Sequence, residues 1–104
     1  MIATIKKLRG IGPKVDLGEG IARGGVIIDV RTTGEYAGGS VKGSMNIPLS
    51  VLPTQLKKLK KDKPVITCCA SGMRSSSAKS ILLSNGFTEV HNGGSWFNLK
   101  KFER

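Results

Sequence analysis

The chain has 104 residues and a formal net charge of +10, so it is long enough for one domain with a hydrophobic core and too short for two. Much of the positive charge lies in lysines between positions 57 and 63 and at positions 100 and 101, and because no aromatic residues alternate with them we interpret this as a solvated surface, with no nucleic-acid partner. The sequence has no apolar run long enough to span a bilayer and no signal-peptide core, so we expect a cytoplasmic protein without membrane contact. Its two adjacent cysteines fit neither a structural disulfide nor the spacing of a zinc site, and we expect no metal or cofactor.

The first quarter of the chain predicts a tail followed by the start of the domain. Residues 1–14 show no clean periodicity and are expected to form an N-terminal tail, which leaves residues 15–104 for the domain. Residues 15–17 are expected to open a sheet. A short helix over residues 17–23 is expected to end at the glycine pair that follows it.

A buried strand and a capped helix come next. Residues 26–30 form a β-branched apolar run interrupted only by Asp29, which is typical of a strand covered on both faces. Thr32-Thr33 can cap a short helix that holds Glu35 and Tyr36, and we expect Arg31 and Glu35 to pair around that turn as a structural contact.

The remaining elements alternate between strands and helices. We expect strands at residues 44–47, 65–68 and 88–91, and amphipathic helices at residues 50–60 and 75–85. A glycine pair then turns the chain into a final helix. This alternation predicts an α/β fold in which a mainly parallel central sheet is flanked by helices and the site lies at the carboxyl ends of the strands.

The segment after the strand at 65–68 carries the chemistry. It reads Cys68-Cys69-Ala70-Ser71-Gly72-Met73-Arg74 and leads into a helix. Loop N–H groups at a helix N-terminus stabilise negative charge and lower the pKa of a thiol. We therefore expect a thiolate nucleophile here, with Arg74 either holding an anionic substrate group or bracing the loop.

The cysteine doublet permits two interpretations. Counted from Cys69 the spacing is Cys-x4-Arg, whereas counted from Cys68 it is Cys-x5-Arg, the spacing of cysteine-dependent phosphatases and arsenate reductases. The local pattern favours Cys69, because Cys68 is then the last strand residue and packs into the sheet as a small buried side chain.

Several segments in order resemble one family, the rhodanese family of sulfurtransferases. The match covers roughly residues 15 to 102 and includes the loop from Cys69 to Ser75, the Val26–Arg31 segment, Glu35-Tyr36, the Gly43–Leu49 segment, and Gly93-Gly94 with Trp96. The resemblance implies a rhodanese-like domain and transfer of sulfane sulfur from thiosulfate or a persulfide donor to a thiol or cyanide acceptor. A persulfide on the loop cysteine is the implied intermediate.

The resemblance also implies roles for individual residues. Cys69 is the catalytic residue, and the active-site loop that binds substrate consists of Ala70, Ser71, Gly72, Met73 and Arg74. Asp29 and Arg31 are supporting residues, with Asp29 a structural hydrogen-bonding group. The implied partners are a small anionic sulfur donor, a thiol or cyanide acceptor, and a sulfur-relay protein.

Two positions depart from the family pattern. Ser40 stands where relatives usually carry histidine, and Ala70 stands where many carry a charged or bulkier residue. These differences leave the identity of the substrate undetermined but do not affect the predicted fold. A persulfide carrier in a sulfur relay is the alternative function. A non-catalytic binding module of the same fold is disfavoured by the presence of Cys69.

Overall fold

The computed structural model describes residues 16–104, and the tail predicted for residues 1–14 lies outside them. The elements in chain order are α1 (Leu17–Ala22), β1 (Val26–Asp29), α2 (Thr33–Ala37), β2 (Met45–Asn46), η1 (Leu49–Thr54), η2 (Leu56–Lys58), β3 (Val65–Cys69), α3 (Met73–Ser84), β4 (Val90–Ser95) and η3 (Trp96–Phe102), where η marks a 3₁₀-helix.

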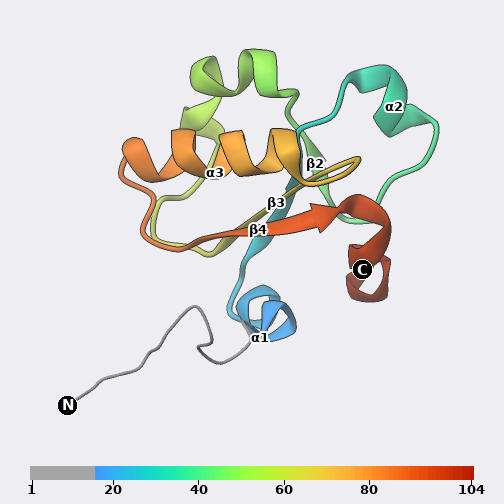
Figure 1. The fold of residues 1–104 in the computed structure, drawn as a ribbon. Coiled ribbons are helices and arrows are strands. Elements are labelled where there is room, and N and C mark those ends of the chain that lie inside the picture. Colours follow the sequence, from blue (N-terminus) through green and yellow to red (C-terminus); the bar gives the residue numbers. More distant parts are fainter. Residues whose placement is uncertain (1–15) are drawn as a thin grey trace.

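The described residues form a four-stranded sheet in the order β2-β1-β3-β4, with every neighbouring pair parallel. Parallel neighbours require crossover connections, and these place helices on both faces. Helices α3 and η1 cover one face, while α1 and η3 cover the other (Figure 1). The predicted α/β fold with a parallel central sheet is confirmed, and the two apolar runs predicted as strands are its central strands.

Each face of the sheet has its own hydrophobic core. The core under α3 and η1 consists of Ile28, Val30, Ile47, Leu52, Leu59, Val65, Cys69, Ala78, Leu82, Phe87 and Val90. The core under α1 and η3 consists of Ile21, Ile27, Val41, Ile66, Cys68 and Leu99. Because the strands between them are covered on both sides, alternate residues of β1 and β3 contribute to different cores.

The prediction that residues 15–17 open the sheet was wrong for the part that the structure describes. Asp16 instead caps α1, since its carboxylate accepts a hydrogen bond of 3.0 Å from the N–H of Glu19. The sheet begins at Val26. The chain turns between α1 and β1 at Gly24, whose φ of 92° lies in the left-handed region.

Two other predicted elements differ in form. The helix expected over residues 50–60 is a pair of 3₁₀ segments. Pro53 supplies no N–H for an α-helical ladder, and Gln55, with φ −112° and ψ 8°, leaves the helical region between the two segments. The last strand runs through Gly93 and Gly94 instead of ending before them. Its pairing with β3 shifts register between Thr67 and Cys69, which lets the strand continue alongside the loop.

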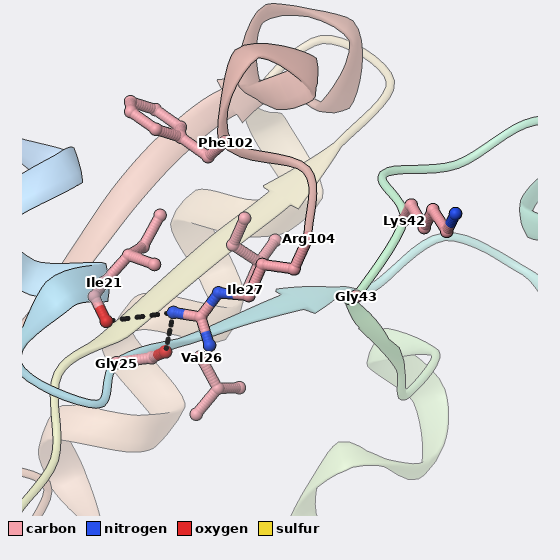
Figure 2. A pocket seen from close by; sticks show the side chains of 8 residues that line it. All are labelled: Ile21, Gly25, Val26, Ile27, Lys42, Gly43, Phe102 and Arg104. Atoms are coloured by element: carbon pink, nitrogen blue, oxygen red, sulfur yellow. Dashed lines mark hydrogen bonds between the residues drawn. The ribbon is translucent and has the colours of Figure 1, made fainter.

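A small cavity of about 50 Å³ lies where β1 begins, near α1 (Figure 2). Arg104 reaches into this region, and its guanidinium donates to the carbonyl oxygens of Ile21 at 2.9 Å and Gly25 at 3.4 Å. The cavity is at the amino end of the sheet, whereas Cys69 ends β3 at the carboxyl end. We therefore treat it as a packing feature and place the candidate site at the other end.

Candidate active site

Strand β3 ends in two cysteines whose side chains lie on opposite faces of the sheet. Cys68 packs in the core under α1 and η3, and Cys69 in the core under α3 and η1. Both are buried, as predicted for Cys68, with 0% and 1% of their surface exposed. The alternation of strand side chains therefore separates the two thiols, and only Cys69 lies on the side of the loop and of α3.

The loop after Cys69, residues 70–74, and the first turn of α3 direct backbone N–H groups at the sulfur of Cys69. The N–H of Gly72 donates to Sγ over 3.0 Å, and that of Ser75 over 3.4 Å. Gly72 adopts a φ of 105°, a left-handed conformation that a residue with a side chain adopts only with strain. The Cys69 thiol also lies 3.5 Å from the Ser75 hydroxyl, to which it donates. The loop is thus organised around one sulfur atom.

These contacts give the two thiols different acidities. Burial alone raises the pKa of Cys69, but hydrogen bonds from the Ser75 side chain and N–H and from the N–H groups of Gly72 and Ser71 outweigh it and lower the pKa to about 7. Burial, together with the charge of Asp29, raises the pKa of Cys68 to about 12. At neutral pH the thiolate therefore forms on Cys69.

Asn92, on β4, fixes the loop from the side. Its side-chain amide donates to the carbonyl oxygen of Gly72 at 3.1 Å. Its carbonyl oxygen accepts from the Ser75 hydroxyl at 2.6 Å and from the N–H of Gly94 at 2.9 Å. Sequence reasoning did not assign a role to Asn92 or Ser75. The available signal was a polar residue at the carboxyl end of the strand beside the loop.

An open depression of about 590 Å³ adjoins the loop on the β4 side, and it is lined by Ser71, Gly72, Met73, Ser76, Asn92, Gly93 and Gly94. Of the other predicted loop residues, Ala70 is exposed like Ser71, and Met73 begins α3 with 79% of its surface exposed. Their side chains line or border the mouth of the site, while their backbone shapes the loop around Cys69.

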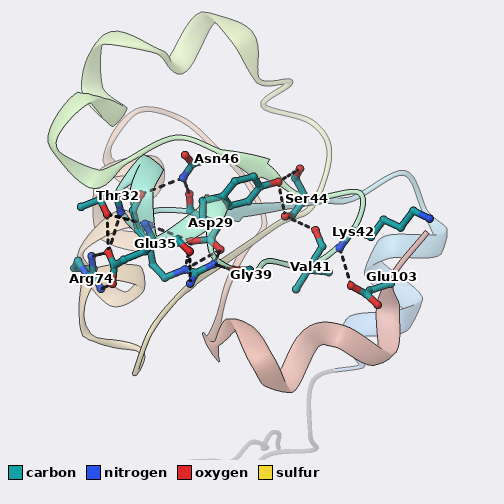
Figure 3. A network of polar contacts seen from close by, with 12 residues as sticks. Asp29, Thr32, Glu35, Gly39, Val41, Lys42, Ser44, Asn46, Arg74 and Glu103 are labelled. Atoms are coloured by element: carbon teal, nitrogen blue, oxygen red, sulfur yellow. Dashed lines mark hydrogen bonds and ion pairs between the residues drawn. The ribbon is translucent and has the colours of Figure 1, made fainter.

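Arg74, the last residue of the loop, pairs with Glu35 of α2 (Figure 3). Its two terminal nitrogens donate to the two carboxylate oxygens at 2.7 and 3.0 Å. The Arg74 guanidinium, helped by donors on Thr32, lowers the pKa of Glu35 to about 2. The structure therefore gives Arg74 a carboxylate partner on the neighbouring element, 39 residues away in sequence.

Asp29 and Arg31 form a buried pair at the end of β1. The Arg31 side chain donates to both carboxylate oxygens of Asp29, with distances of 2.7 to 3.0 Å, and to the carbonyl of Gly39 at 2.7 Å. It also lies 4.6 Å above the Trp96 ring. The predicted pairing of Arg31 with the Glu35 side chain was wrong, because the nearer Asp29 takes the guanidinium and only the Glu35 carbonyl oxygen contacts it, at 3.4 Å.

Within residues 16–104, no group of three or more histidine, cysteine, aspartate or glutamate side chains is arranged to hold a metal ion. In the same part of the chain, none of the helices has the length and apolar character needed to cross a bilayer.

Comparison with known proteins identifies a family. The model of the family described as "Rhodanese-like domain" matches residues 14–100, which is most of the chain. YqhL of Bacillus subtilis, described as an uncharacterized protein, is 42% identical over 66 residues, which cover 64% of this chain and 52% of that protein. The chain thus spans about half the length of YqhL.

Two further similarities come from a named sulfurtransferase and a solved structure. "Thiosulfate sulfurtransferase GlpE" of Stutzerimonas stutzeri is 34% identical over 76 residues, covering 73% of this chain and 70% of that protein. The solved structure entitled "rhodanese with anions from E. coli" superposes with a TM-score of 0.67 at 33% identity, covering 71% of this chain and 89% of the other.

Proposed function

Since the chain belongs to the rhodanese-like domain family of sulfurtransferases, we propose that it transfers sulfane sulfur through a persulfide on Cys69. The observation that carries this proposal is the convergence of the Gly72 and Ser75 N–H groups on the buried sulfur of Cys69. A persulfide places its negative charge on the outer sulfur, and a ring of N–H donors stabilises that charge without a metal or cofactor.

The reaction has two steps that balance without an added oxidant. In the first, the Cys69 thiolate attacks the outer sulfur of thiosulfate. The bond between the two thiosulfate sulfurs breaks, and its electron pair leaves with sulfite. In the second, an acceptor thiolate or cyanide attacks the outer sulfur of the persulfide. The product is an acceptor persulfide or thiocyanate, and the Cys69 thiolate is regenerated.

The low pKa of Cys69 supports both steps. A thiol with a pKa of about 7 is partly ionised at neutral pH, and it is a good nucleophile in the first step and a good leaving group in the second. The phosphatase and arsenate reductase alternative would need Cys68 as the nucleophile. Its burial in the opposite core and its pKa of about 12 disfavour that role.

The test is mass spectrometry of the protein after incubation with thiosulfate. We expect one added sulfur, about 32 Da, which peptide mapping places on Cys69. Cys69→Ala should lose both the added mass and thiosulfate:cyanide sulfur transfer, while the matched variant Cys68→Ala should keep most of the activity. Added mass on Cys68, or hydrolysis of an aryl phosphate that Cys68→Ala abolishes, would refute the proposal.

A carrier in a sulfur relay would use the same persulfide with a different donor. Two rates measured on the same protein separate the two functions. The enzyme proposed here turns over thiosulfate repeatedly, whereas a carrier would turn it over slowly and accept sulfur rapidly from a cysteine desulfurase.

A further inference from the structure

The carboxylate of Glu35 is bound by four hydrogen-bond donors (Figure 3). Two come from Thr32, whose N–H donates at 3.0 Å and whose hydroxyl donates at 3.1 Å, both to Oε1. Two come from the guanidinium of Arg74, one to each carboxylate oxygen, at 2.7 and 3.0 Å. We call the donors of Thr32 and Arg74 the anion cradle. The cradle presents a planar fork and two further donors to a group with at least two negative oxygens.

The cradle lies on the same side of the sheet as the nucleophile. Arg74 and Thr32 line a cavity of about 300 Å³ whose other lining residues are Val30, Pro48, Leu49 and Ser50. Val30 belongs to the same hydrophobic core as Cys69. Arg74 itself is the residue that precedes Ser75, which contacts the sulfur. An anion in the cradle therefore sits beside the active-site loop.

The contact between Arg74 and Glu35 is suited to exchange. The two side chains are 36% and 38% exposed, so water reaches both. Exposed ion pairs contribute little net free energy, and a second anion can compete for the same donors. Within residues 16–104, the hydrogen bonds of the Arg74 guanidinium both go to Glu35, and none goes to a loop carbonyl. Among the described residues, the Arg74 guanidinium therefore faces a carboxylate and does not brace the loop through its carbonyl oxygens.

We propose that Glu35 is an internal occupant of the anion cradle, and that the oxyanion group of the sulfur donor binds by displacing the Glu35 carboxylate from Arg74. This inference rests on the proposed sulfur transfer for its biological meaning. Glu35 acts through Arg74 and is therefore a positioning residue. Its carboxylate sets a threshold that favours donors whose sulfonyl group presents two or three oxygens to the cradle, such as a thiosulfonate or thiosulfate, over persulfides, which have no oxyanion group.

The variant Glu35→Gln tests this displacement with little damage to the fold. Glutamine at this position can still accept from the Thr32 N–H, so the cap of α2 is retained, but the negative charge is lost. We expect kcat/KM for thiosulfate to rise about two- to fivefold, through a lower KM. Glu19→Gln is the matched control, because Glu19 also forms an exposed ion pair, with Arg23 on α1.

Binding of inorganic sulfate provides a readout that does not need turnover. Isotope-labelled protein is titrated with sulfate, and binding is followed by NMR through the amide resonances of residues 32–35 and 74. Sulfate should bind more tightly to Glu35→Gln than to wild type, and more weakly to Arg74→Lys. Glu35→Ala, which removes both charge and cap, should change sulfate affinity in the same direction as Glu35→Gln.

The possible failures are distinguishable. If thiosulfate never forms a persulfide but sulfate still binds more tightly to Glu35→Gln, the sulfur-transfer proposal fails and the cradle stands. If transfer proceeds but Glu35→Gln leaves KM and sulfate affinity unchanged, or lowers kcat together with the melting temperature, Glu35 braces the loop and the displacement is refuted.

Discussion

Removing the Ser75 hydroxyl should raise the pKa of Cys69 without dismantling the loop. Ser75 is fully buried, and among the described residues its hydroxyl is the only side-chain hydrogen-bond partner of the sulfur, accepting from the thiol at 3.5 Å. A thiolate cannot donate, so we expect this hydroxyl, which donates to Asn92 at 2.6 Å, to turn and donate to the sulfur when the thiol ionises. In Ser75→Ala that donor is gone, whereas the N–H groups of Gly72 and of residue 75 remain in place.

The magnitude follows from the geometry. A hydrogen bond to a charged group contributes about 1.5–3 kcal/mol, and we use the lower end because the contact is long and the hydroxyl must first leave Asn92. This corresponds to about one pH unit in the midpoint of ionisation. At pH 7 the thiolate fraction should fall from about one half to about one tenth.

The assay is the rate of alkylation by iodoacetamide between pH 5 and 10, recorded on Cys68→Ala to leave one thiol. We expect a rate about fivefold lower for Ser75→Ala at pH 7 and equal rates above pH 9. Ser77→Ala, an exposed serine of the same helix, is the control and should not shift the midpoint. An unchanged midpoint in Ser75→Ala would show that the backbone N–H groups alone set the acidity.

Three other predictions concern stability. Asp29→Asn leaves the Arg31 guanidinium buried without its carboxylate and should cost about 3–5 kcal/mol in urea unfolding; a loss no larger than that of the exposed control Asp62→Asn would refute a structural role for the pair. Gly93→Ala places a Cβ 2.9 Å from atoms of Ile66 and Leu99 and 3.0 Å from the Thr67 carbonyl, and should lower the free energy of unfolding by about 1–3 kcal/mol; wild-type stability would show that β4 shifts freely. The lowered pKa of Cys69, from 9.0 to about 7, means that between these pH values the unfolded chain holds a proton that the folded chain has lost. The free energy of unfolding should therefore rise from pH 7 to pH 9, and this contribution should be absent below pH 7. Cys69→Ala should remove this rise, which amounts to about 2–3 kcal/mol.

Local patterns explain why much of the fold was predictable. The apolar runs at 26–30 and 65–68 became the two central strands, because short β-branched apolar runs are typical of strands buried on both faces. Of the threonine pair expected to cap α2, Thr32 forms the cap, and Glu35 completes it with a hydrogen bond in the reverse direction. The prediction of one amphipathic helix at 50–60 was wrong in form. The leucine spacing there fits an α-helix, but Pro53 interrupts the hydrogen bonding that an α-helix requires.

The parts of the candidate site that depend on neighbours in sequence could be predicted from local patterns, while the catalytic role of Cys69 stays a prediction. The different environments of Cys68 and Cys69 follow from strand alternation, and the loop around the sulfur follows from its glycine and serine content. The contacts that complete the site join distant segments. Asn92 meets Ser75 across 17 residues, and such pairings depend on strand order and register, which composition does not determine.

The opposite placement of the two thiols also determines how the protein can discharge a bound sulfur. A disulfide requires the two Cβ atoms to approach within about 4.5 Å with a defined twist, and adjacent residues of β3 direct theirs into different cores. Cys68 therefore cannot act as a resolving thiol for a persulfide or sulfenic acid on Cys69 unless the central strand comes apart. No second thiol of the same chain can therefore remove the outer sulfur or oxygen from Cys69. A separate acceptor molecule must reach Cys69 from the open side of the loop to regenerate the thiolate.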